Sequence, residues 1–442
     1  MRTACGRTAL AEPRRAGSAR AFVVAAPQSG SGKTLITLGL LRALRNRGLA
    51  VRSCKVGPDY IDPGFHAAAT GAPCNNLDLW AMGRDTCAAL LARQAAEAEV
   101  VIVEGVMGLF DGPQGAEGST ADLAAALALP VVLVIDCSHQ AQSIAALVSG
   151  FTQFRKDVQI VGLILNRVKS DRHEALLREA LKGAPPVLGV VRQTDSLALP
   201  SRHLGLVQAQ ENQSLETLLE SAATGVARET ILDKLIQIGT PITNQAAGNS
   251  LPPPGQHIAV ARDEAFSFAY PHLLTGWREA GASLSFFSPL ANEAPAADAD
   301  FIFLPGGYPE LHAGRLASAL NFFDGLAKSR ATIYGECGGY MVLGQGLTDA
   351  QGVRHTMACM LPLETSFATR KLHLGYRQLK SFGGPFQTWL RGHEFHYSTE
   401  KLFPGAQPLF QASTAAGEDL GPMGQRMGRL MGSYAHVIAG AP

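Results

Sequence analysis

The stretch Gly335-Glu336-Cys337-Gly338-Gly339 decides the fold of the C-terminal half of the chain. Apolar residues 331–334 precede it, and residues 340–344 can open a helix. A strand that turns sharply into a helix exposes the residue at the corner, and flanking glycines let neighbouring backbone approach closely. The pattern predicts a nucleophile elbow whose nucleophile is Cys337, with a thiol pKa lowered by the helix N-terminus. On this pentapeptide alone, a buried structural cysteine beside a glycine-rich turn is equally compatible.

A second motif, Pro27-Gln28-Ser29-Gly30-Ser31-Gly32-Lys33-Thr34, lies between an apolar strand at 21–26 and an amphipathic helix at 35–47. This order is that of a phosphate-binding loop, although Pro27 replaces its usual first glycine. We expect Lys33 to neutralise the β and γ phosphates of ATP and the Thr34 hydroxyl to bind Mg²⁺. The residues expected to contact the nucleotide are Gln28, Ser29, Gly30, Ser31, Gly32, Lys33 and Thr34.

Carboxylates follow two further strands of this half. Asp59 and Asp62 lie in a Pro/Gly-rich loop after a strand at 50–56, where parallel sheets bind their ligands. Glu104 closes an apolar strand at 100–103, the position that serves Mg²⁺ in phosphate-loop proteins, and Asp111 follows in a glycine-flanked loop. An Asp-Pro turn and a plain strand end are the structural alternatives to these functional interpretations.

The totals indicate a globular enzyme with more than one domain. The chain has 442 residues, 46% of them hydrophobic and 17% charged, and a net charge of +1, so no global field recruits nucleic acid or an anionic membrane. Seven scattered cysteines without a C-x-x-C pair favour a reducing cytoplasm. No run reaches the ~20 apolar residues of a membrane helix, and we expect residues 1–19 to be a disordered extension.

The domain organisation is read from composition. Apolar strands at 130–136 and 158–165 predict a parallel sheet with both faces covered, in an ATP-binding domain spanning residues 20–240. Residues 241–256 are rich in proline and glycine and predict a linker. A second α/β domain at 257–442 is expected to contain strands at 257–261, 283–287 and 300–304 and a helix at 266–279.

The second domain also supplies candidate partners for Cys337. Gly306 and Gly307 follow a strand and offer backbone N–H groups for a developing oxyanion. A distant histidine is the expected base, and His393, His396 and His436 are the candidates. The residues alone do not choose among the three, and His393 and His396 are equally compatible with substrate binding or with a polar core.

Taken together and in this order, these motifs resemble the cobyrinic or hydrogenobyrinic acid a,c-diamide synthases, glutamine-dependent ligases of vitamin B12 biosynthesis. The resemblance covers residues 20–438 and includes 391–398 and 433–436. It implies a dethiobiotin-synthetase-like phosphate-loop domain fused to a class I glutamine amidotransferase domain, with ATP, glutamine and Mg²⁺. By position it implies that Cys337 is the glutaminase nucleophile and His436 its activating base. Class I domains often carry a Glu two residues after this His, but here that residue is Ile438, which is consistent with a Cys–His dyad.

The resemblance also implies roles in the ATP domain. Asp59, Asp62 and Asp111 would act in catalysis, Tyr60 and Ile61 would bind the substrate, and Thr34 and Glu104 would bind the metal. The implied partner is a tetrapyrrole polycarboxylic acid, with a homodimer as a candidate assembly and neither nucleic acid nor membrane. The same chemistry on another acid, such as nickel sirohydrochlorin, and a non-catalytic phosphate-loop regulatory protein are the alternatives.

Overall fold

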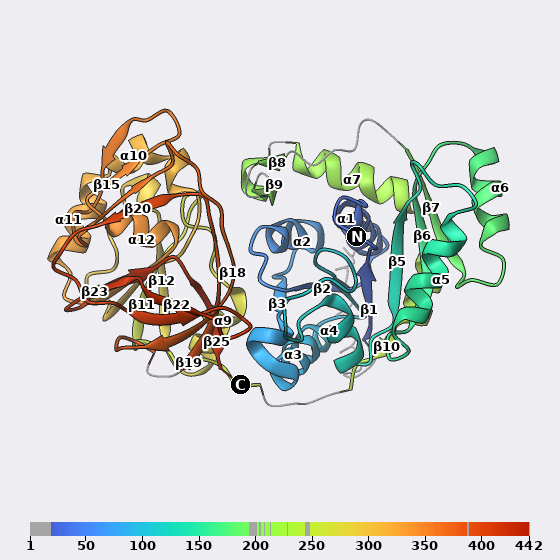
Figure 1. The fold of residues 1–442 in the computed structure, drawn as a ribbon, viewed down its shortest axis with the longest axis horizontal. Helices are drawn as coiled ribbons and strands as arrows, with labels where there is room; N and C mark the ends of the chain where they lie inside the picture. The colour runs from blue at the N-terminus through green and yellow to red at the C-terminus, as the bar shows by residue number, and fades with distance from the viewer. Residues whose placement is uncertain are drawn as a thin grey trace, which may run out of the picture.

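The computed structural model describes residues 19–193, 201–202, 205–206, 208–212, 214–227, 229–243, 248–386 and 389–441. Residues 1–18 of the expected N-terminal extension, and residues 244–247 of the expected linker, lie outside this range. Figure 1 shows two α/β halves side by side, one coloured blue to green and the other yellow to red. The described helices include none that is long and apolar enough to cross a membrane.

The first half is a mainly parallel sheet, as the uniformly apolar strands predict. Its strand order is β3 (Asn75–Leu77), β2 (Val51–Val56), β4 (Val100–Glu104), β1 (Arg20–Ala25), β5 (Val131–Asp136), β6 (Ile160–Val168) and β7 (Val187–Arg192), and β10 (Thr240–Pro241) pairs with β1. The helices are α1 (Lys33–Asn46), α2 (Asp62–Thr70), α3 (Leu79–Ala96), α4 (Thr120–Ala126), α5 (Ile144–Phe154), α6 (Asp171–Ala180), α7 (Leu215–Val226) and α8 (Glu229–Ile238). A short pair, β8 (Ser201–Arg202) and β9 (Gly205–Leu206), lies apart from this sheet.

Strand β1 shows why this sheet is covered on both faces. Ala21 and Val23 pack into one buried cluster, whereas Phe22 and Val24 pack into another. Successive side chains of a strand point to opposite faces, so a strand buried on both faces must be apolar throughout. The one polar residue of β1, Arg20, is therefore at its end, and the candidate site residue Glu104 likewise closes β4.

The second half combines a mainly parallel sheet with two smaller sheets. The main sheet has the order β12 (Ser283–Phe287), β11 (His257–Ala261), β13 (Phe301–Leu304), β14 (Thr332–Glu336), β24 (Leu430–Ser433) and β23 (Gln425–Met427). An antiparallel sheet contains β22 (Asp419–Met423), β21 (Phe410–Ser413), β18 (His373–Ser381), β19 (Trp389–His396) and β25 (His436–Gly440). A third contains β16 (Arg354–Thr356), β15 (Gly346–Thr348), β17 (Leu363–Ser366) and β20 (Thr399–Leu402), and the helices are α9 (Pro271–Glu279), α10 (Ala313–Ala317), α11 (Leu320–Lys328) and α12 (Gly338–Leu343).

One expected element of this half is wrong at its start. The helix expected at 266–279 begins only at Pro271. Phe268 instead forms an isolated β-bridge with Gly306, and its N–H donates to the Gly306 carbonyl over 2.9 Å. This tertiary hydrogen bond outweighs the local helical pattern, and Pro271 supplies the first-turn residue that lacks an N–H.

The elbow has the geometry that its sequence predicts. Cys337 lies between β14 and α12 with φ 46° and ψ −105°, a backbone conformation that L-residues rarely adopt. A Cβ on Gly339 would lie 2.0 Å from the Leu304 carbonyl oxygen. Glycine is therefore required where the helix crosses the neighbouring strand β13, and this close packing holds Cys337 at the corner.

The two halves share a continuous interface. α3 packs against β25, and a single buried cluster contains residues of both halves, among them Trp80 and Ile438. Polar contacts reinforce it: the Tyr376 hydroxyl donates to Asp78 over 2.8 Å, and the Tyr270 hydroxyl donates to the Pro58 carbonyl over 2.9 Å. Apolar burial and directed hydrogen bonds together fix the relative position of the two candidate sites.

We predict that Gly339→Ala lowers the free energy of unfolding by about 1–3 kcal/mol, because the added methyl group overlaps backbone that cannot move aside. Urea denaturation measures the change. Gly150→Ala is the matched control, since Gly150 is exposed on α5 with nothing within 4 Å of an added Cβ. The control should be neutral or slightly stabilising, and an equal loss in both variants would contradict the account of the elbow.

Candidate active site

The phosphate loop is braced from the end of β6. The Ser31 hydroxyl donates to the Gln28 carbonyl over 2.9 Å, and the Asn166 amide donates to the Ser31 carbonyl over 2.9 Å. A Cβ on Gly32, whose φ is 85°, would lie 2.2 Å from the Asn166 amide nitrogen. Asn166 therefore holds the loop backbone in shape.

The predicted metal-binding pair lies together. The Thr34 hydroxyl donates to Glu104 Oε1 over 2.7 Å, and Lys33 Nζ lies 3.9 Å from the same oxygen. A hydroxyl and a carboxylate in contact are oxygen donors of the kind that Mg²⁺ prefers. Burial, together with the nearby Lys55, lowers the pKa of Lys33 to about 8. A bound polyphosphate would favour the charged ammonium.

Two residues that the sequence reasoning missed complete this cluster. Lys55 Nζ lies 3.0 Å from Asp62 Oδ2 and 3.2 Å from Glu104 Oε1, and it donates to the Gly105 carbonyl over 2.9 Å. His66 Nε2 lies 2.6 Å from Glu104 Oε2. The signal for Lys55 was its place near the end of a buried strand that pairs with the Glu104 strand. No local signal marks His66.

These cations determine the charge of the buried carboxylates. Burial alone would raise the pKa of Glu104, but Lys55, His66 and Lys33 hold it below its ordinary value. Asp62 behaves differently, because burial and the neighbouring Asp59 raise its pKa to about 6 despite the opposing effect of Lys55. Glu104 is thus a permanent anion at neutral pH, whereas Asp62 is close to its titration range.

The loop with Asp59 and Tyr60 is held by its own backbone. Asp59 Oδ1 accepts from the Ile61 N–H over 2.8 Å and from the Asp62 N–H over 3.1 Å. The Asn76 amide donates to the Asp59 carbonyl over 2.6 Å. Ile61 is buried against α1 and its neighbours, so it supports the loop from beneath. Asp111 lies apart on the next loop, where it accepts from the Gly108 N–H over 2.9 Å.

The candidate glutaminase residues gather around the Gly306-Gly307 turn. A Cβ on Gly306 would lie 2.2 Å from His436 Cε1, and a Cβ on Gly338 would lie 3.1 Å from the Gly307 nitrogen. The Cys337 N–H donates to the Ser433 carbonyl over 2.8 Å, which ties the elbow to the segment that leads to His436. Of the three candidate histidines, the structure places His436 against this turn. Within the described residues, neither His436 ring nitrogen makes a hydrogen bond.

Burial controls both groups of this pair. Cys337 is buried, and burial raises the pKa of its thiol, with nearby Glu310 adding to the effect. The lower thiol pKa expected from the helix N-terminus is therefore wrong for this state, because α12 starts in the interior. Burial also lowers the pKa of His436 to about 3. Both groups are thus neutral at rest.

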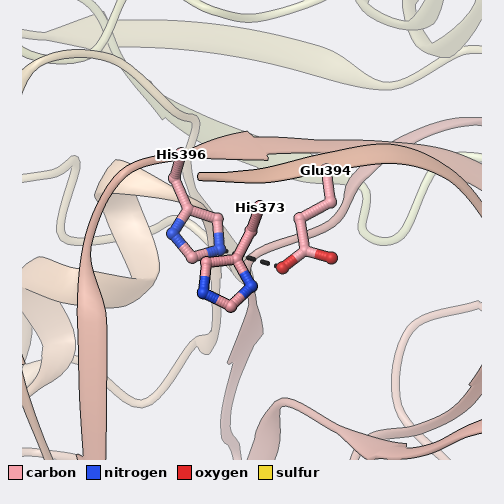
Figure 2. A group of neighbouring side chains, drawn as sticks. All are labelled: His373, Glu394 and His396. Carbon is pink, nitrogen blue, oxygen red and sulfur yellow. Dashed lines mark hydrogen bonds and ion pairs between the residues drawn. The ribbon is translucent and has the colours of Figure 1, made fainter. Parts of the chain in front are cut away.

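The other two histidines have different surroundings. His396 Nε2 lies 2.9 Å from Glu394 Oε1, and Arg377 Nε donates to Glu394 Oε2 over 2.7 Å. Figure 2 shows His373, Glu394 and His396 together. The two imidazole rings are stacked with an interplanar angle of 3°, so their in-plane lone pairs do not converge as metal ligands require. Arg377 already neutralises the carboxylate, which favours an orienting network.

A cavity of about 370 Å³ opens where the two halves meet beside Asp59. Its lining is mainly apolar and comes from both halves: Pro58, Tyr60, Ile61, Val106, Met107 and Pro113 from the first, and Leu374, Tyr376, His393 and Phe395 from the second. Leu374 and Met107 are exposed at its mouth. An apolar cavity with a carboxylate at its edge has the character of a small-molecule site.

Tyr60 joins the two candidate sites directly. Its ring centroid lies 4.4 Å from that of His436 and 4.6 Å from that of Phe268, with near-parallel planes in both pairs. The same short loop carries Asp59 and Asp62, which lie beside the phosphate-loop cluster. A single aromatic side chain, that of Tyr60 on a loop of the first half, therefore lies between the glutaminase candidates and the nucleotide-site carboxylates.

Comparisons with known proteins agree with this arrangement. A model described as the CobQ/CobB/MinD/ParA nucleotide binding domain matches residues 22–207, and one described as the CobB/CobQ-like glutamine amidotransferase domain matches residues 257–442. Hydrogenobyrinate a,c-diamide synthase from Brucella anthropi is 55% identical over 95% of this chain and 98% of its own. Those from Rhizobium meliloti and Agrobacterium fabrum are 53% and 48% identical, over 94% and 96% of this chain and 98% and 99% of their own.

The fold and the sites define a glutamine amidotransferase domain joined to a phosphate-loop nucleotide-binding domain. The chain belongs to the hydrogenobyrinate a,c-diamide synthase family. Both the fold class and the family resemblance predicted from the sequence are confirmed. The domain boundaries and the roles of individual site residues stay predictions.

We predict that Lys55→Met lowers the free energy of unfolding by about 3 kcal/mol, because removing one partner leaves buried carboxylates without compensation. Urea denaturation measures the loss. Arg52→Met, on the same strand, is the control: Arg52 pairs 2.9 Å from the largely exposed Glu97, and such pairs contribute about 0–1 kcal/mol. Equal losses in the two variants would contradict the buried charge cluster.

Proposed function

We propose that this chain catalyses the ATP- and glutamine-dependent amidation of the a and c carboxylates of hydrogenobyrinic acid or cobyrinic acid. The observation that carries the proposal is the loop with Asp59, Tyr60 and Asp62, which reaches from the phosphate-loop cluster to His436. A nucleotide site that activates an acid and a thiol site that releases ammonia are then neighbours. Family membership supports the choice of substrate.

The first chemical step activates the acid. A substrate carboxylate oxygen attacks the γ-phosphorus of ATP, the bond to the bridging β–γ oxygen breaks, and ADP leaves an acyl phosphate behind. Such transfers are catalysed mainly by positioning and charge neutralisation, which Lys33 is placed to supply. Thr34 and Glu104 would hold Mg²⁺, which when bound neutralises phosphate charge. Asp59, Asp62 and Asp111 would position the acid and the phosphoryl group.

The second step releases ammonia. Cys337 sulfur attacks the side-chain amide carbon of glutamine, and the thiol proton passes through His436 to the departing nitrogen. Backbone N–H groups of the Gly306-Gly307 turn and the elbow would stabilise the oxyanion, which the closeness of the Gly307 nitrogen to Gly338 supports. The thioester that remains is hydrolysed to glutamate. Ammonia crosses past Tyr60 and attacks the acyl phosphate, which forms the amide and releases phosphate.

The cavity between the halves is the proposed tetrapyrrole site. Its apolar wall suits the macrocycle, and Asp59, which is among its lining residues, would position the acid for activation. The cavity volume admits part of such a large acid, with the remaining side chains at the mouth near Leu374. The described cysteines are all unpaired, which supports the proposed cytoplasmic location.

The function is tested by mass spectrometry of purified protein incubated with ATP, Mg²⁺ and glutamine. Hydrogenobyrinic acid, cobyrinic acid and nickel sirohydrochlorin are offered separately, and the amide groups gained are counted. We expect two amides on hydrogenobyrinic or cobyrinic acid. Amidation of nickel sirohydrochlorin alone would favour the alternative substrate, and no amidation with no glutamate release would favour a regulatory protein.

We predict that Cys337→Ala abolishes glutamine-dependent amidation and leaves ammonia-dependent amidation intact, because only ammonia release requires the thiol. Both donors are assayed by product mass. Cys359→Ala is the matched control, since Cys359 is the exposed cysteine of the described residues. Loss of both activities in Cys337→Ala would mean that the thiol supports the fold instead.

We predict that Leu374→Asp raises the KM for the tetrapyrrole acid about tenfold or more, a loss of ~1.4 kcal/mol of binding, because an anion replaces apolar surface at the cavity mouth. Steady-state amidation with ammonia as donor measures it. Leu420→Asp is the control, as Leu374 and Leu420 have 54% and 46% exposure in the same sheet and only Leu374 lines the cavity. Equal KM values would exclude this cavity as the acid site.

A further inference from the structure

The imidazole of His436 needs an orienting group that the local sequence does not supply. A catalytic histidine acts well only when one ring nitrogen is held as the donor, so that the other is free to accept the proton of the nucleophile. Residue 438, where class I domains often place a carboxylate, is a fully buried isoleucine. His436 is itself fully buried, and neither ring nitrogen has a partner at full hydrogen-bond geometry among the described residues, although the Phe268 backbone lies near the ring.

A carboxylate reaches the same position from another strand. Glu336 precedes the nucleophile at the end of β14, and its Oε2 lies 4.0 Å from His436 Nδ1. Its other oxygen, Oε1, accepts from the Val437 N–H and from the Tyr334 hydroxyl, each over 3.1 Å. These two bonds aim Oε2 at the imidazole. Glu336 is 2% exposed, so water does not occupy this gap freely.

We propose that Glu336 is the third member of a Cys337–His436–Glu336 triad, supplied by the strand before the nucleophile. It is a positioning residue: its Oε2 accepts the Nδ1–H of His436 and thereby leaves Nε2 as the base for the Cys337 thiol. The inference rests on the glutaminase activity of the proposed function. It replaces the Cys–His dyad that Ile438 suggested.

The proton balance of the step explains the need for this carboxylate. When sulfur attacks the amide carbon, the thiol proton moves to Nε2 and the ring becomes a buried cation. Desolvation opposes that cation, as the lowered pKa of His436 indicates, and an anion at Nδ1 offsets the cost. The proton on Nε2 then goes to the leaving nitrogen as the carbon–nitrogen bond breaks, so Glu336 gains no proton over the step.

Other carboxylates near the site are less suitable. Glu394 is already bound by Arg377 over 2.7 Å and by His396 over 2.9 Å, so both of its oxygens belong to another network. Burial raises the pKa of Glu336 to about 8, so the anion that acts in the triad is the minority form at neutral pH while His436 is neutral. A nearby imidazolium would stabilise this carboxylate, so the electrostatics and the position of Glu336 both favour His436 as its partner.

The test compares glutamine hydrolysis by wild type, Glu336→Gln and Glu336→Asp. Glutamine keeps an oxygen acceptor for the Val437 N–H but loses the charge. We expect kcat to fall about 10²- to 10⁴-fold in Glu336→Gln, as for other triads without their carboxylate, with the KM for glutamine nearly unchanged. Glu336→Asp should recover part of the loss, and ammonia-dependent amidation should stay at the wild-type rate in both.

Glu364→Gln is the control, because Glu364 pairs with Arg354 on a different sheet of the same domain. This variant should hydrolyse glutamine at the wild-type rate. A wild-type kcat in Glu336→Gln, or a parallel loss of ammonia-dependent amidation, would overturn the proposal. If Glu336→Gln does not fold, Glu336→Asp decides it, since unchanged kcat there would also overturn it. Failure of the proposed function is distinguishable, because wild type would then amidate with neither donor.

Discussion

The packing of the Tyr60 ring against both Phe268 and His436 is the contact on which the arrangement depends. The tyrosine belongs to the first half, and both of its ring partners belong to the second. Its loop is anchored by Asn76 and continues into Asp62, whose carboxylate meets Lys55. The interface cluster fixes the halves against each other, so this aromatic contact sets how far ammonia must travel between the two reactions.

The two sites manage buried charge in opposite ways. In the nucleotide site, two lysines and His66 surround Glu104, which stays ionised without substrate. In the glutaminase site, burial keeps Cys337 and His436 neutral, and in the proposed mechanism an ion pair would form there only during reaction. The first site is therefore suited to anionic phosphate, and in the proposed triad Glu336 would support the charge that appears transiently in the second.

Sequence reasoning reached the features that local pattern determines. The phosphate loop, the pairing of Thr34 with Glu104 and the elbow at Cys337 each follow from motifs set between apolar strands, and the structure shows them in those places. Features that depend on register and packing were missed. Lys55 meets Glu104 only because β2 pairs with β4, His66 reaches it from a helix, and the depth at which α12 starts reverses the expected pKa of Cys337.

The central claim is that nitrogen passes internally from one site to the other. It is tested most directly with glutamine labelled with ¹⁵N in its side-chain amide, supplied together with a large excess of unlabelled ammonium. Mass spectrometry of the amidated tetrapyrrole then measures the origin of the nitrogen. Internal transfer predicts that nearly every new amide on the tetrapyrrole carries ¹⁵N despite the excess of unlabelled ammonium. A product whose label is diluted to the isotopic ratio of the solution would contradict it.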